Sequence, residues 1–231
     1  MTWRVLPCGE HALLVELDAL DDVLALHGAV RAAREDGEEA LADVADVVPG
    51  ARTLLVVARE GTDLSSLRRA LPDLAARRPS GSAAGAPRHG APAVVEIRVR
   101  YDGPDLDEVA ELTGLAPKEV VAAHTGTPWR AAFAGFAPGF TYLAGGDPRL
   151  RVPRRSEPRT SVLAGSVGLA GGFSAVYPRS SPGGWQLLGH TEATLWDVGR
   201  EPPALIQPGS MVHFVDVDAD AETRDGDEGR R

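Results

Sequence analysis

Residues 164–178 read AGSVGLAGGFSAVYP, in which four glycines separate short pieces rich in small and apolar residues. Residues 125–215 as a whole have this texture, with many glycines and prolines between short β-rich pieces. The pieces that we expect to form strands are residues 161–163, 174–177, 185–188, 194–198 and 211–215. Short strands with frequent turn signals are typical of a closed or nearly closed β-barrel. The sequence therefore predicts a mostly β architecture for this half of the chain.

Helical signals precede this β-rich region. Residues 94–99 are rich in β-branched residues and predict a strand. Asp105 can cap a helix that Gly114 closes. Pro117 suits the first position of another short helix, which reaches His124. We therefore expect one strand and two helices before the barrel pieces begin.

About eighty residues at the start of the chain alternate between strand and helix patterns. The strand patterns cover residues 3–7, 12–17, 44–48 and 53–58. Asp21 can cap a helix that continues through about Arg34. Residues 63–77 form a second helical stretch, which Pro72 interrupts or ends early. The order β-β-α-β-β-α predicts a small α+β sandwich.

Two segments lack the features of packed structure. Residues 79–92 read PSGSAAGAPRHGAP, which has no periodic apolar face and is typical of a linker. Residues 216–231 are acidic and lack large apolar groups, so they cannot bury enough surface to offset the entropy of ordering. In this chain of 231 residues we therefore expect an N-terminal domain over residues 1–78 and a barrel domain over residues 93–215, followed by a disordered acidic tail.

Composition excludes several classes of function. The formal net charge is −9 at pH 7, which argues against a binder of nucleic acids or anionic membranes, because such proteins neutralise phosphates with basic residues. The single cysteine, Cys8, excludes an internal disulfide framework and a multi-cysteine zinc site. The sequence has neither a metal-ligand spacing of histidines nor a P-loop lysine motif. No apolar run reaches ~18 residues and no signal-peptide pattern opens the chain, so a cytoplasmic protein is expected.

Residues 135–146 read GFAPGFTYLAGG and combine aromatic residues with glycines. Phe136, Phe140 and Tyr142 carry large apolar faces, and the glycines allow close approach of the backbone. Such a segment can wall an apolar pocket that exposes backbone amides, or it can be a tight loop that plugs one end of the barrel. The glycine turns of residues 164–178 likewise suit either an anion-binding nest of backbone amides or a glycine-kinked strand.

Several polar side chains are candidates for chemistry. His124 can act as a general acid or base near neutral pH, or it can simply contact the last carbonyls of its helix. Arg159 can pair with a carboxylate or phosphate through two hydrogen bonds. Gln186 offers both a donor and an acceptor, and it can equally belong to a hairpin plug. The basic residues near Arg159 either attract anions or form a solvated face; they are Arg149, Arg151, Arg154 and Arg155.

Several motifs, taken in order, resemble one family. They are His124 followed by GFAPGFTYL (135–143), PR (158–159), AGSVGLAGG (164–172), VYP (176–178) and SPGGWQLLG (181–189). In this order they resemble the family of 5-oxoprolinase B subunits, also called allophanate hydrolase subunit 1 or the sporulation-kinase inhibitor KipI family. The N-terminal LPCGEHALLVEL and VVPGARTLLVV resemble the entry strands of that family, so the similarity covers about residues 3–215.

The resemblance implies a fold and an activity. The fold is α+β and mostly β, with a ferredoxin-like N-terminal domain followed by a cyclophilin-like β-barrel domain. The activity is that of the B subunit of an ATP-dependent 5-oxoprolinase, which opens the lactam of 5-oxo-L-proline to L-glutamate together with the C and A subunits. The complex consumes ATP at a site shared with the C subunit, through phosphorylation of the amide oxygen. This chain is then expected to be inactive alone, and no metal site is visible in its sequence.

The resemblance also implies roles for individual residues. His124 is an acid or base group or a polar anchor, and Arg159 holds a carboxylate or phosphate. Backbone amides around Gly139 and Gly165 contact anionic oxygens. The expected substrate-binding residues are Phe136, Pro138, Gly139, Phe140, Tyr142, Gly165, Ser166 and Gln186.

One departure from the family pattern bears on the substrate. Phe173-Ser174-Ala175 stands where many relatives are expected to carry Gln-Thr-Gly, so the substrate can differ from 5-oxoproline. Other functions also remain open. One is an inhibitor of sensor histidine kinases that acts by protein contact through an exposed patch. Another is the amide-cleaving side of a urea-degrading system. The last is prolyl isomerisation, but the sequence has no cyclophilin catalytic motif, and a fold does not imply a function.

Overall fold

The computed structural model describes residues 3–77 and 93–219 of the chain. Contacts divide the chain into two compact units, residues 1–90 and 91–231. The predicted linker, residues 79–92, lies outside the described residues. The part of the predicted acidic tail beyond residue 219 also lies outside the described residues. Residues 216–219, which the prediction assigned to the disordered tail, have regular secondary structure. The last strand extends to Asp216, and the next three residues are helical.

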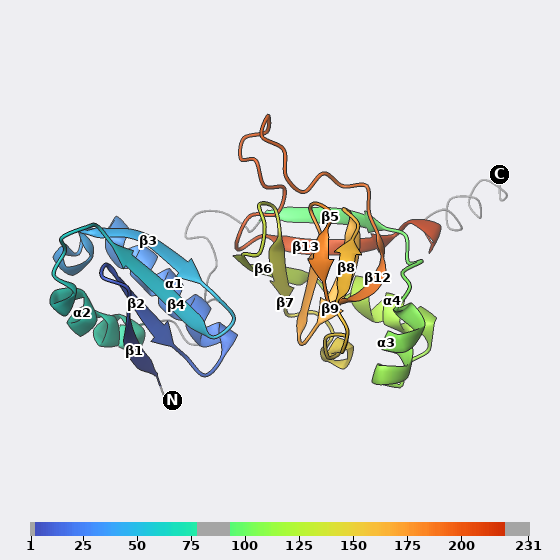
Figure 1. The fold of residues 1–231 in the computed structure, drawn as a ribbon, viewed down its shortest axis with the longest axis horizontal. Helices are drawn as coiled ribbons and strands as arrows, with labels where there is room; N and C mark the ends of the chain where they lie inside the picture. The colour runs from blue at the N-terminus through green and yellow to red at the C-terminus, as the bar shows by residue number, and fades with distance from the viewer. Residues whose placement is uncertain (1–2, 78–92, 220–231) are drawn as a thin grey trace, which may run out of the picture. The chain divides into compact units, whose positions relative to one another are not determined.

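The first unit consists of one sheet and two long helices (Figure 1). Its elements are β1 (Arg4–Cys8), β2 (Ala12–Glu16), α1 (Leu20–Glu35), the short 3₁₀ helix η1 (Glu39–Leu41), β3 (Val44–Pro49), β4 (Thr53–Ala58) and α2 (Leu64–Arg77). The strand order is β1-β2-β4-β3, and each neighbouring pair is antiparallel. The elements therefore follow the predicted order β-β-α-β-β-α.

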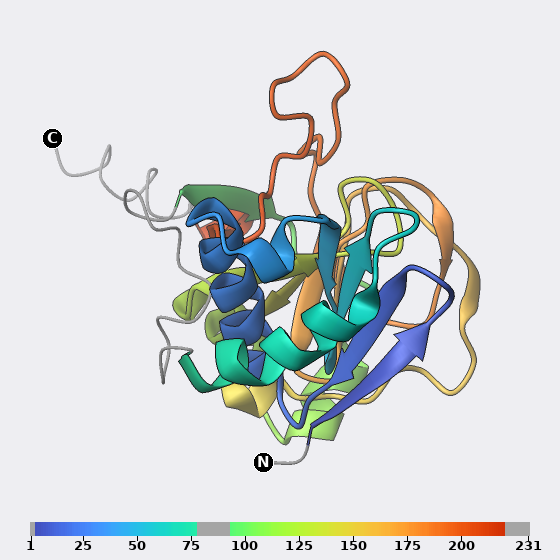
Figure 2. The same cartoon turned by 90° about the vertical axis from the view of Figure 1, so that its left-hand side faces the viewer.

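Alternation along β4 explains how this sheet packs. Leu54, Val56 and Ala58 are buried, while the residues between them are partly exposed. Because successive side chains on a strand point to opposite faces, one face of the sheet carries the core. α1 and α2 pack against this sheet, and Figure 2 shows both helices on the same side of it. Their apolar residues, among them Leu26 and Leu71, complete the core.

Two details of these helices differ from the prediction. Ala19 occupies the N-cap position of α1, so Asp21 lies in the first helical turn, where its charge complements the helix dipole. α2 continues through Pro72 instead of ending there. A proline inside a helix costs about 3 kcal/mol. The flanking residues Leu71 and Leu74 are buried in the core and hold the helix in place despite that cost.

The second unit contains two α-helices, one short 3₁₀ helix and nine strands among the described residues. Its elements are β5 (Val94–Val99), α3 (Leu106–Thr113), α4 (Pro117–Gly126), β6 (Trp129–Ala134), β7 (Thr141–Ala144), the 3₁₀ helix η2 (Pro148–Leu150), β8 (Arg159–Val162), β9 (Ser166–Ala170), β10 (Phe173–Val176), β11 (Ser181–Gly183), β12 (Gln186–His190) and β13 (Met211–Asp216). Seven strands form one sheet in the order β12-β9-β10-β7-β6-β13-β5, and β11 pairs with β8 in a separate ribbon. The β13–β5 pair is parallel.

A bridge between Arg100 and His190 joins the two ends of the seven-stranded sheet. The backbone N–H of each residue donates to the carbonyl of the other at 2.9 Å. Gly189 makes this approach possible, because a Cβ atom there would collide with the carbonyl group of Arg100. The sheet is therefore a nearly closed β-barrel, as the glycine-rich sequence predicts.

The barrel sheet has packed side chains on both faces. One face encloses a core with α3 and α4, which includes Trp129 and Leu143 from the sheet and Val109 and Val120 from the helices. The other face carries a second cluster around Phe140. These two clusters determine where the predicted site residues lie.

The structure corrects several of the predicted strands. Residues 194–198 form a loop in which Trp196 makes one isolated bridge to Ala204. The prediction also omitted β6, β7, β9 and β11. All five residues of β9, which read SVGLA, are buried. A strand buried on both faces has no alternation of apolar and polar residues, so periodicity alone does not reveal it.

Candidate functional site

An ion-pair cluster lies at the start of α3, next to β12. Asp105 is 2% exposed, and its Oδ1 atom accepts hydrogen bonds from Nη1 of Arg155 at 2.8 Å and from Nη2 of Arg159 at 2.6 Å. Its Oδ2 atom accepts a third bond from the backbone N–H of Leu187 at 2.7 Å. One buried carboxylate therefore positions two guanidinium groups against the barrel.

This use of Asp105 differs from the prediction. Asp105 occupies the N-cap position of α3, as expected, but its side chain makes no capping hydrogen bond. Both oxygens of the Asp105 carboxylate are bonded elsewhere, to Arg155, Arg159 and the backbone N–H of Leu187. Tertiary contacts therefore replace the capping hydrogen bond. At the other end of α3, Gly114 adopts the left-handed conformation expected of a helix-ending glycine, with φ of 71°.

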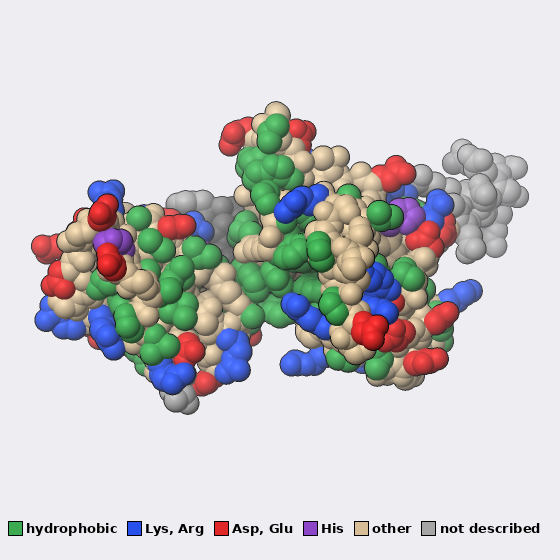
Figure 3. All heavy atoms as spheres, viewed as in Figure 1, with side chains coloured by type: hydrophobic (Ala, Val, Ile, Leu, Met, Phe, Trp, Pro, Cys, Tyr) green, Lys and Arg blue, Asp and Glu red, His purple; other side chains and the backbone are tan. Residues whose placement is uncertain are grey.

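Gln186 and Glu108 extend this cluster along β12 and α3. Nε2 of Gln186 donates to Oε1 of Glu108 at 3.2 Å, and Nη1 of Arg155 donates to Oε2 of Glu108 at 3.3 Å. Gln186 is 1% exposed, whereas the Glu108 side chain is half-exposed. Figure 3 shows basic and acidic side chains meeting on this side of the barrel, between β12 and α3. Two predicted site residues, Arg159 and Gln186, are thus joined through Asp105, Arg155 and Glu108, and we call these five residues the guanidinium cluster.

The predicted aromatic residues gather on the sheet face that carries the second core cluster. The ring of Phe140 lies edge-to-face with Tyr142 and with Trp185, at centroid distances of 5.1 Å and 5.6 Å. Each such pair stabilises a cluster by about 0.5–1.5 kcal/mol beyond its buried area. Phe140 is 2% exposed. Of the two interpretations of this segment, the geometry at Phe140 favours a plug over a pocket wall.

Phe136 is the exposed member of this aromatic group. Its side chain is 60% exposed, and its backbone has φ of 66°, which is unusual for a bulky residue. The N–H of Ala137 donates to the carbonyl of Gly135 at 2.7 Å, so Phe136 is the central residue of a γ-turn. A γ-turn with positive φ is rare and strained. Strain of this kind persists where the surrounding structure imposes it, and it concentrates at ligand-binding and switch regions.

Pro138 and Gly139 form the next turn of the β6–β7 hairpin. The N–H of Phe140 donates to the carbonyl of Ala137 at 2.9 Å, and Gly139 has φ of 82°. Proline followed by a glycine with positive φ is the signature of a type II turn. A Cβ atom on Gly139 would lie 2.9 Å from the Cβ atom of Trp196, so this turn packs closely against the loop that contains Trp196.

His124 lies in the core between the sheet and the helices and is fully buried. Its Nδ1 atom is 2.7 Å from the hydroxyl of Tyr101, and its Nε2 atom is 2.9 Å from the hydroxyl of Ser174. Burial lowers the pKa of His124 to about 3, so the ring is neutral at physiological pH. Burial also raises the pKa of Tyr101, whose hydroxyl keeps its proton and can donate to Nδ1. Of the two predicted roles of His124, the geometry favours a polar anchor.

Strand β10 separates His124 from the aromatic group. Ser174 faces His124, whereas its neighbours Phe173 and Ala175 belong to the aromatic cluster on the other face. Side chains alternate between the faces of a strand, so His124 and Phe140 lie on opposite sides of the sheet. His124 and Arg159 also belong to different hydrogen-bond networks. The predicted residues therefore do not converge on one site, because His124 lies on the opposite face of the sheet from Phe140 and shares no hydrogen bond with Arg159.

The backbone amides of Gly165 and Ser166 are engaged by the fold itself. The N–H of Gly165 donates to the carbonyl of Tyr177 at 2.8 Å, and that of Ser166 donates to the carbonyl of Leu163 at 3.3 Å. A donor that is already paired within the protein is not available to an anion. The geometry here favours the glycine-kinked strand over the anion-binding nest.

Sequence reasoning missed the acidic half of the guanidinium cluster. Asp105 has the position of an ordinary helix cap, and Glu108 has that of an ordinary helix surface residue. Arg155 entered only as one member of a basic group. A usable signal was the spacing of Asp105 and Glu108, because residues three apart share one face of a helix. Two acids on one helix face, in a chain with a concentrated basic segment, predict an ion-pair cluster.

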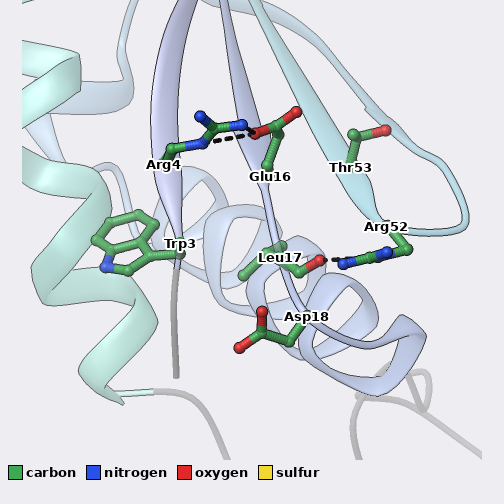
Figure 4. Close-up of a pocket in the computed structure, with 7 residues that line it drawn as sticks. All are labelled: Trp3, Arg4, Glu16, Leu17, Asp18, Arg52 and Thr53. Carbon is green, nitrogen blue, oxygen red and sulfur yellow. Dashed lines mark hydrogen bonds and ion pairs between the residues drawn. The ribbon is translucent and has the colours of Figure 1, made fainter.

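Two surface hollows are lined by other residues. The hollow on the first unit, of about 380 Å³, is lined by Trp3, Arg4, Glu16, Leu17, Asp18, Arg52 and Thr53 (Figure 4). There Nε of Arg4 donates to Glu16 at 2.9 Å, and Arg52 points to the carbonyl of Leu17. The hollow on the barrel unit, of about 470 Å³, is lined by Glu96, Arg98, Arg100, His190, Thr191, Glu192, Ala193 and Val217. None of the predicted site residues lines either hollow.

Metal ligands and membrane spans are absent from the parts of the chain that the structure describes. Over residues 3–77 and 93–219, no three or more His, Cys, Asp or Glu side chains are grouped so that they could hold a metal ion. Each helix in those ranges is too short or too polar to cross a membrane.

The chain belongs to the family described as carboxyltransferase domain, subdomain C and D, which it matches over residues 3–206. The 5-oxoprolinase B subunit of Bacillus subtilis (strain 168) is 47% identical over 127 residues, which are 54% of this chain and 53% of that protein. The 5-oxoprolinase B subunit of Haemophilus influenzae is 38% identical over 176 residues, which are 75% of this chain and 79% of that protein. The match thus spans about half of the first relative and most of the second. The resemblance inferred from the motifs is confirmed.

The fold also matches a solved structure of a larger protein. The crystal structure of Kluyveromyces lactis urea amidolyase has a TM-score of 0.72 over 96% of this chain and 15% of that chain, at 17% identity. At this identity the likeness concerns the fold alone.

Proposed function

We propose that this chain is the B subunit of an ATP-dependent 5-oxoprolinase, which opens the lactam of 5-oxo-L-proline to L-glutamate together with the C and A subunits. The observation that carries this proposal is the 38% identity to the B subunit of Haemophilus influenzae along 79% of its length. On this proposal the first unit is a ferredoxin-like domain over residues 1–78, and the second is a cyclophilin-like barrel over residues 93–215.

The guanidinium cluster is the part of this chain that suits the reaction best. Ring opening requires an amide carbonyl to become a better electrophile, and the proposed complex achieves this by moving the γ-phosphoryl group of ATP to the lactam oxygen. Water then adds to the ring carbon and the C–N bond breaks, which frees the amine and leaves an acyl phosphate. A second water attacks the acyl phosphate, phosphate leaves and the carboxylate of L-glutamate remains. Negative charge develops on oxygen atoms throughout, and fixed guanidinium groups stabilise such charge.

The Tyr177 hydroxyl lies within electrostatic reach of two arginines. Burial raises the pKa of the Tyr177 hydroxyl, and the nearby charges of Arg154 and Arg159 oppose that rise. In this proposal Arg159 holds an anionic oxygen and Gln186 orients the ligand. His124 anchors the barrel core, and the exposed Phe136 contacts the ligand or the sister subunit.

Reconstitution tests the proposal. The chain is mixed with the A and C subunits of its complex, 5-oxo-L-proline and ATP, and both glutamate and ADP are assayed. We expect activity that requires this chain and falls strongly in Arg159→Ala. The matched control is Arg149→Ala, because Arg149 pairs with Asp147 outside the cluster. Full activity without this chain would contradict the proposal.

A second candidate is a sensor histidine kinase inhibitor that acts by protein contact. The exposed apolar side chains of Phe136, at 60%, and Leu163, at 72%, favour this candidate, because contact inhibition needs such a surface. Inhibition of kinase autophosphorylation by this chain, combined with a 5-oxoprolinase assembly that does not need it, would select the second candidate.

A further inference from the structure

Three polar atoms of the guanidinium cluster are buried without a hydrogen-bond partner. They are Nε of Arg155, Nη1 of Arg159 and Oε1 of Gln186. Nη1 of Arg155 and Nη2 of Arg159 donate to Asp105, and Nε2 of Gln186 donates to Glu108. A buried polar group without a partner is costly, so three such atoms in one cluster call for an explanation, such as a role in the chemistry of a site or a bound water or ion.

Hydrogen bonds orient the side chains of the cluster. Asp105 joins both guanidinium groups to the backbone N–H of Leu187. The backbone N–H of Arg155 donates to the carbonyl of Gly184 at 2.9 Å, which fixes the segment before β8 against the turn before β12. A site whose donors are already oriented loses little freedom when a ligand binds.

The unpaired atoms are two donors and one acceptor, and Glu108 sets that pattern. The guanidinium nitrogens can only donate. Nε2 of Gln186 faces the carboxylate of Glu108, which can only accept while it is ionised, so Oε1 is the atom left unpaired. The opposite orientation of the Gln186 amide would place Oε1 against the carboxylate of Glu108, and two acceptors cannot form a hydrogen bond.

This pattern selects among ligand groups. A carboxylate or phosphate satisfies the two donors but leaves Oε1 of Gln186 unpaired. An amide offers a carbonyl oxygen to the donors and an N–H to the acceptor. In a lactam, the ring holds the carbonyl and the N–H on the same edge, so a single group offers both an acceptor and a donor.

We propose that the guanidinium cluster binds the amide edge of a lactam. The carbonyl oxygen accepts from Arg155 and Arg159, and the N–H donates to Oε1 of Gln186. Asp105 and Glu108 are positioning residues, since they act through the three side chains that touch the ligand. This inference rests on the proposed function and adds which group of the substrate this chain holds.

The first experiment compares ligands that differ in the N–H. In the reconstituted assembly, 5-oxo-L-proline competes with its N-methyl derivative and with the lactone in which oxygen replaces the N–H. We expect the lactam to bind about tenfold or more tightly than either analogue, because one buried hydrogen bond discriminates by that factor. Equal binding of the lactam and the lactone would overturn the inference.

The second experiment changes the acceptor. Gln186→Met has a similar volume and removes the unpaired oxygen, so we expect KM for 5-oxo-L-proline to rise about tenfold and the preference over the lactone to disappear. Gln207→Met is the matched control, because Gln207 bonds to the carbonyl of Ala204 in a loop. If Gln186→Met does not fold, Glu108→Gln is tested in its place, since Glu108 is half-exposed. This change allows the amide of Gln186 to adopt the opposite orientation, so the preference for the lactam over the lactone should again be lost.

The outcomes separate this inference from the proposed function. An assembly that requires the chain but keeps the lactam preference in Gln186→Met, or in Glu108→Gln where Gln186→Met does not fold, overturns the inference and leaves the proposed function standing. An assembly that does not require the chain overturns both. Loss of the lactam preference in the variant, with normal assembly of the complex, supports the inference.

Discussion

The Nε2 atom of His124 lies 2.9 Å from the hydroxyl oxygen of Ser174, although 50 residues separate the two in the sequence. The hydroxyl of Tyr101 occupies the other ring nitrogen at 2.7 Å, and the imidazole packs on Phe214 at a centroid distance of 4.3 Å. Both nitrogens are thus bonded within a core that excludes water. The ring therefore ties α4 to β10, and Ser174 has a role in the fold that explains its presence inside an apolar barrel.

Ser174→Ala should destabilise the barrel. It leaves one nitrogen of a fully buried imidazole without a partner, and such a loss costs about 1–3 kcal/mol. Urea unfolding followed by circular dichroism measures the change in the free energy of unfolding. Ser161→Ala is the control, because Ser161 bonds to Ser180 at the surface and its loss should cost under about 0.5 kcal/mol. Equal losses in the two variants would contradict the role assigned to Ser174.

Stability should fall as the pH falls from about 6.5 towards 3. The pKa of His124 is lowered to about 3 in the folded chain from an ordinary value of 6.5. Between these values the unfolded chain binds a proton that the folded chain does not, so the free energy of unfolding decreases by up to about 1.4 kcal/mol per pH unit. Above pH 6.5 this contribution is fully present.

A variant isolates the part of this pH dependence that belongs to His124. Burial and the charge of Arg31 also lower the pKa of His27, which adds a contribution of the same sign. We therefore compare unfolding at pH 7.5, 6 and 5 in the wild type, His124→Gln and His27→Gln. The slope should flatten more in His124→Gln than in His27→Gln. If the free energy of unfolding of His124→Gln depends on pH as steeply as that of the wild type, His124 is not the source of the pH dependence.

Local sequence patterns predicted the elements of the first unit and the barrel class, but not the contacts that close the barrel. β4 alternates buried and partly exposed residues, and its predicted limits match the structure. β9 has no such alternation, since all of its residues are buried. The bridge between Arg100 and His190 joins residues far apart in the sequence, and no local signal specifies that pairing.

Local sequence patterns also predict only part of the candidate site. The motifs identify Arg159 and Gln186, but the position of Asp105 predicts only a helix cap. Its actual partners, Arg155 and Arg159, come from a segment about fifty residues further on. Which of several compatible partners a carboxylate takes depends on tertiary packing, so helix-capping rules alone cannot decide it.

Asp105→Asn should destabilise the chain far more than Asp102→Asn. Asp105 is a buried carboxylate that compensates two guanidinium groups, and removing one partner of a buried ion pair costs about 3–5 kcal/mol. Asp102 pairs with His190 at the surface, where such pairs contribute about 0–1 kcal/mol. Thermal and urea unfolding of the two variants measure the difference. Similar losses would show that the guanidinium cluster does not hold the barrel together.

At position 136, a glycine variant should be more stable than an alanine variant, which reverses the usual order of their stabilities. Alanine normally stabilises a folded chain by about 0.5–1 kcal/mol relative to glycine. At Phe136 the backbone has φ of 66°, which penalises every residue with a Cβ atom by about 1–2 kcal/mol. Both substitutions remove the ring, so its contacts with Phe140 cancel in the comparison. We therefore expect Phe136→Gly to be more stable than Phe136→Ala by about 1 kcal/mol.

The neighbouring Ala137 provides the control for this reversal. Phe136 is the non-glycine residue with positive φ among those that the structure describes, so Ala137 has an ordinary backbone. Ala137→Gly should therefore show the usual order and cost about 0.5–1 kcal/mol. If Phe136→Ala proves at least as stable as Phe136→Gly, the turn stores no strain. The exposed ring is then an ordinary surface residue, and its assignment as a contact for the ligand or the sister subunit loses its physical basis.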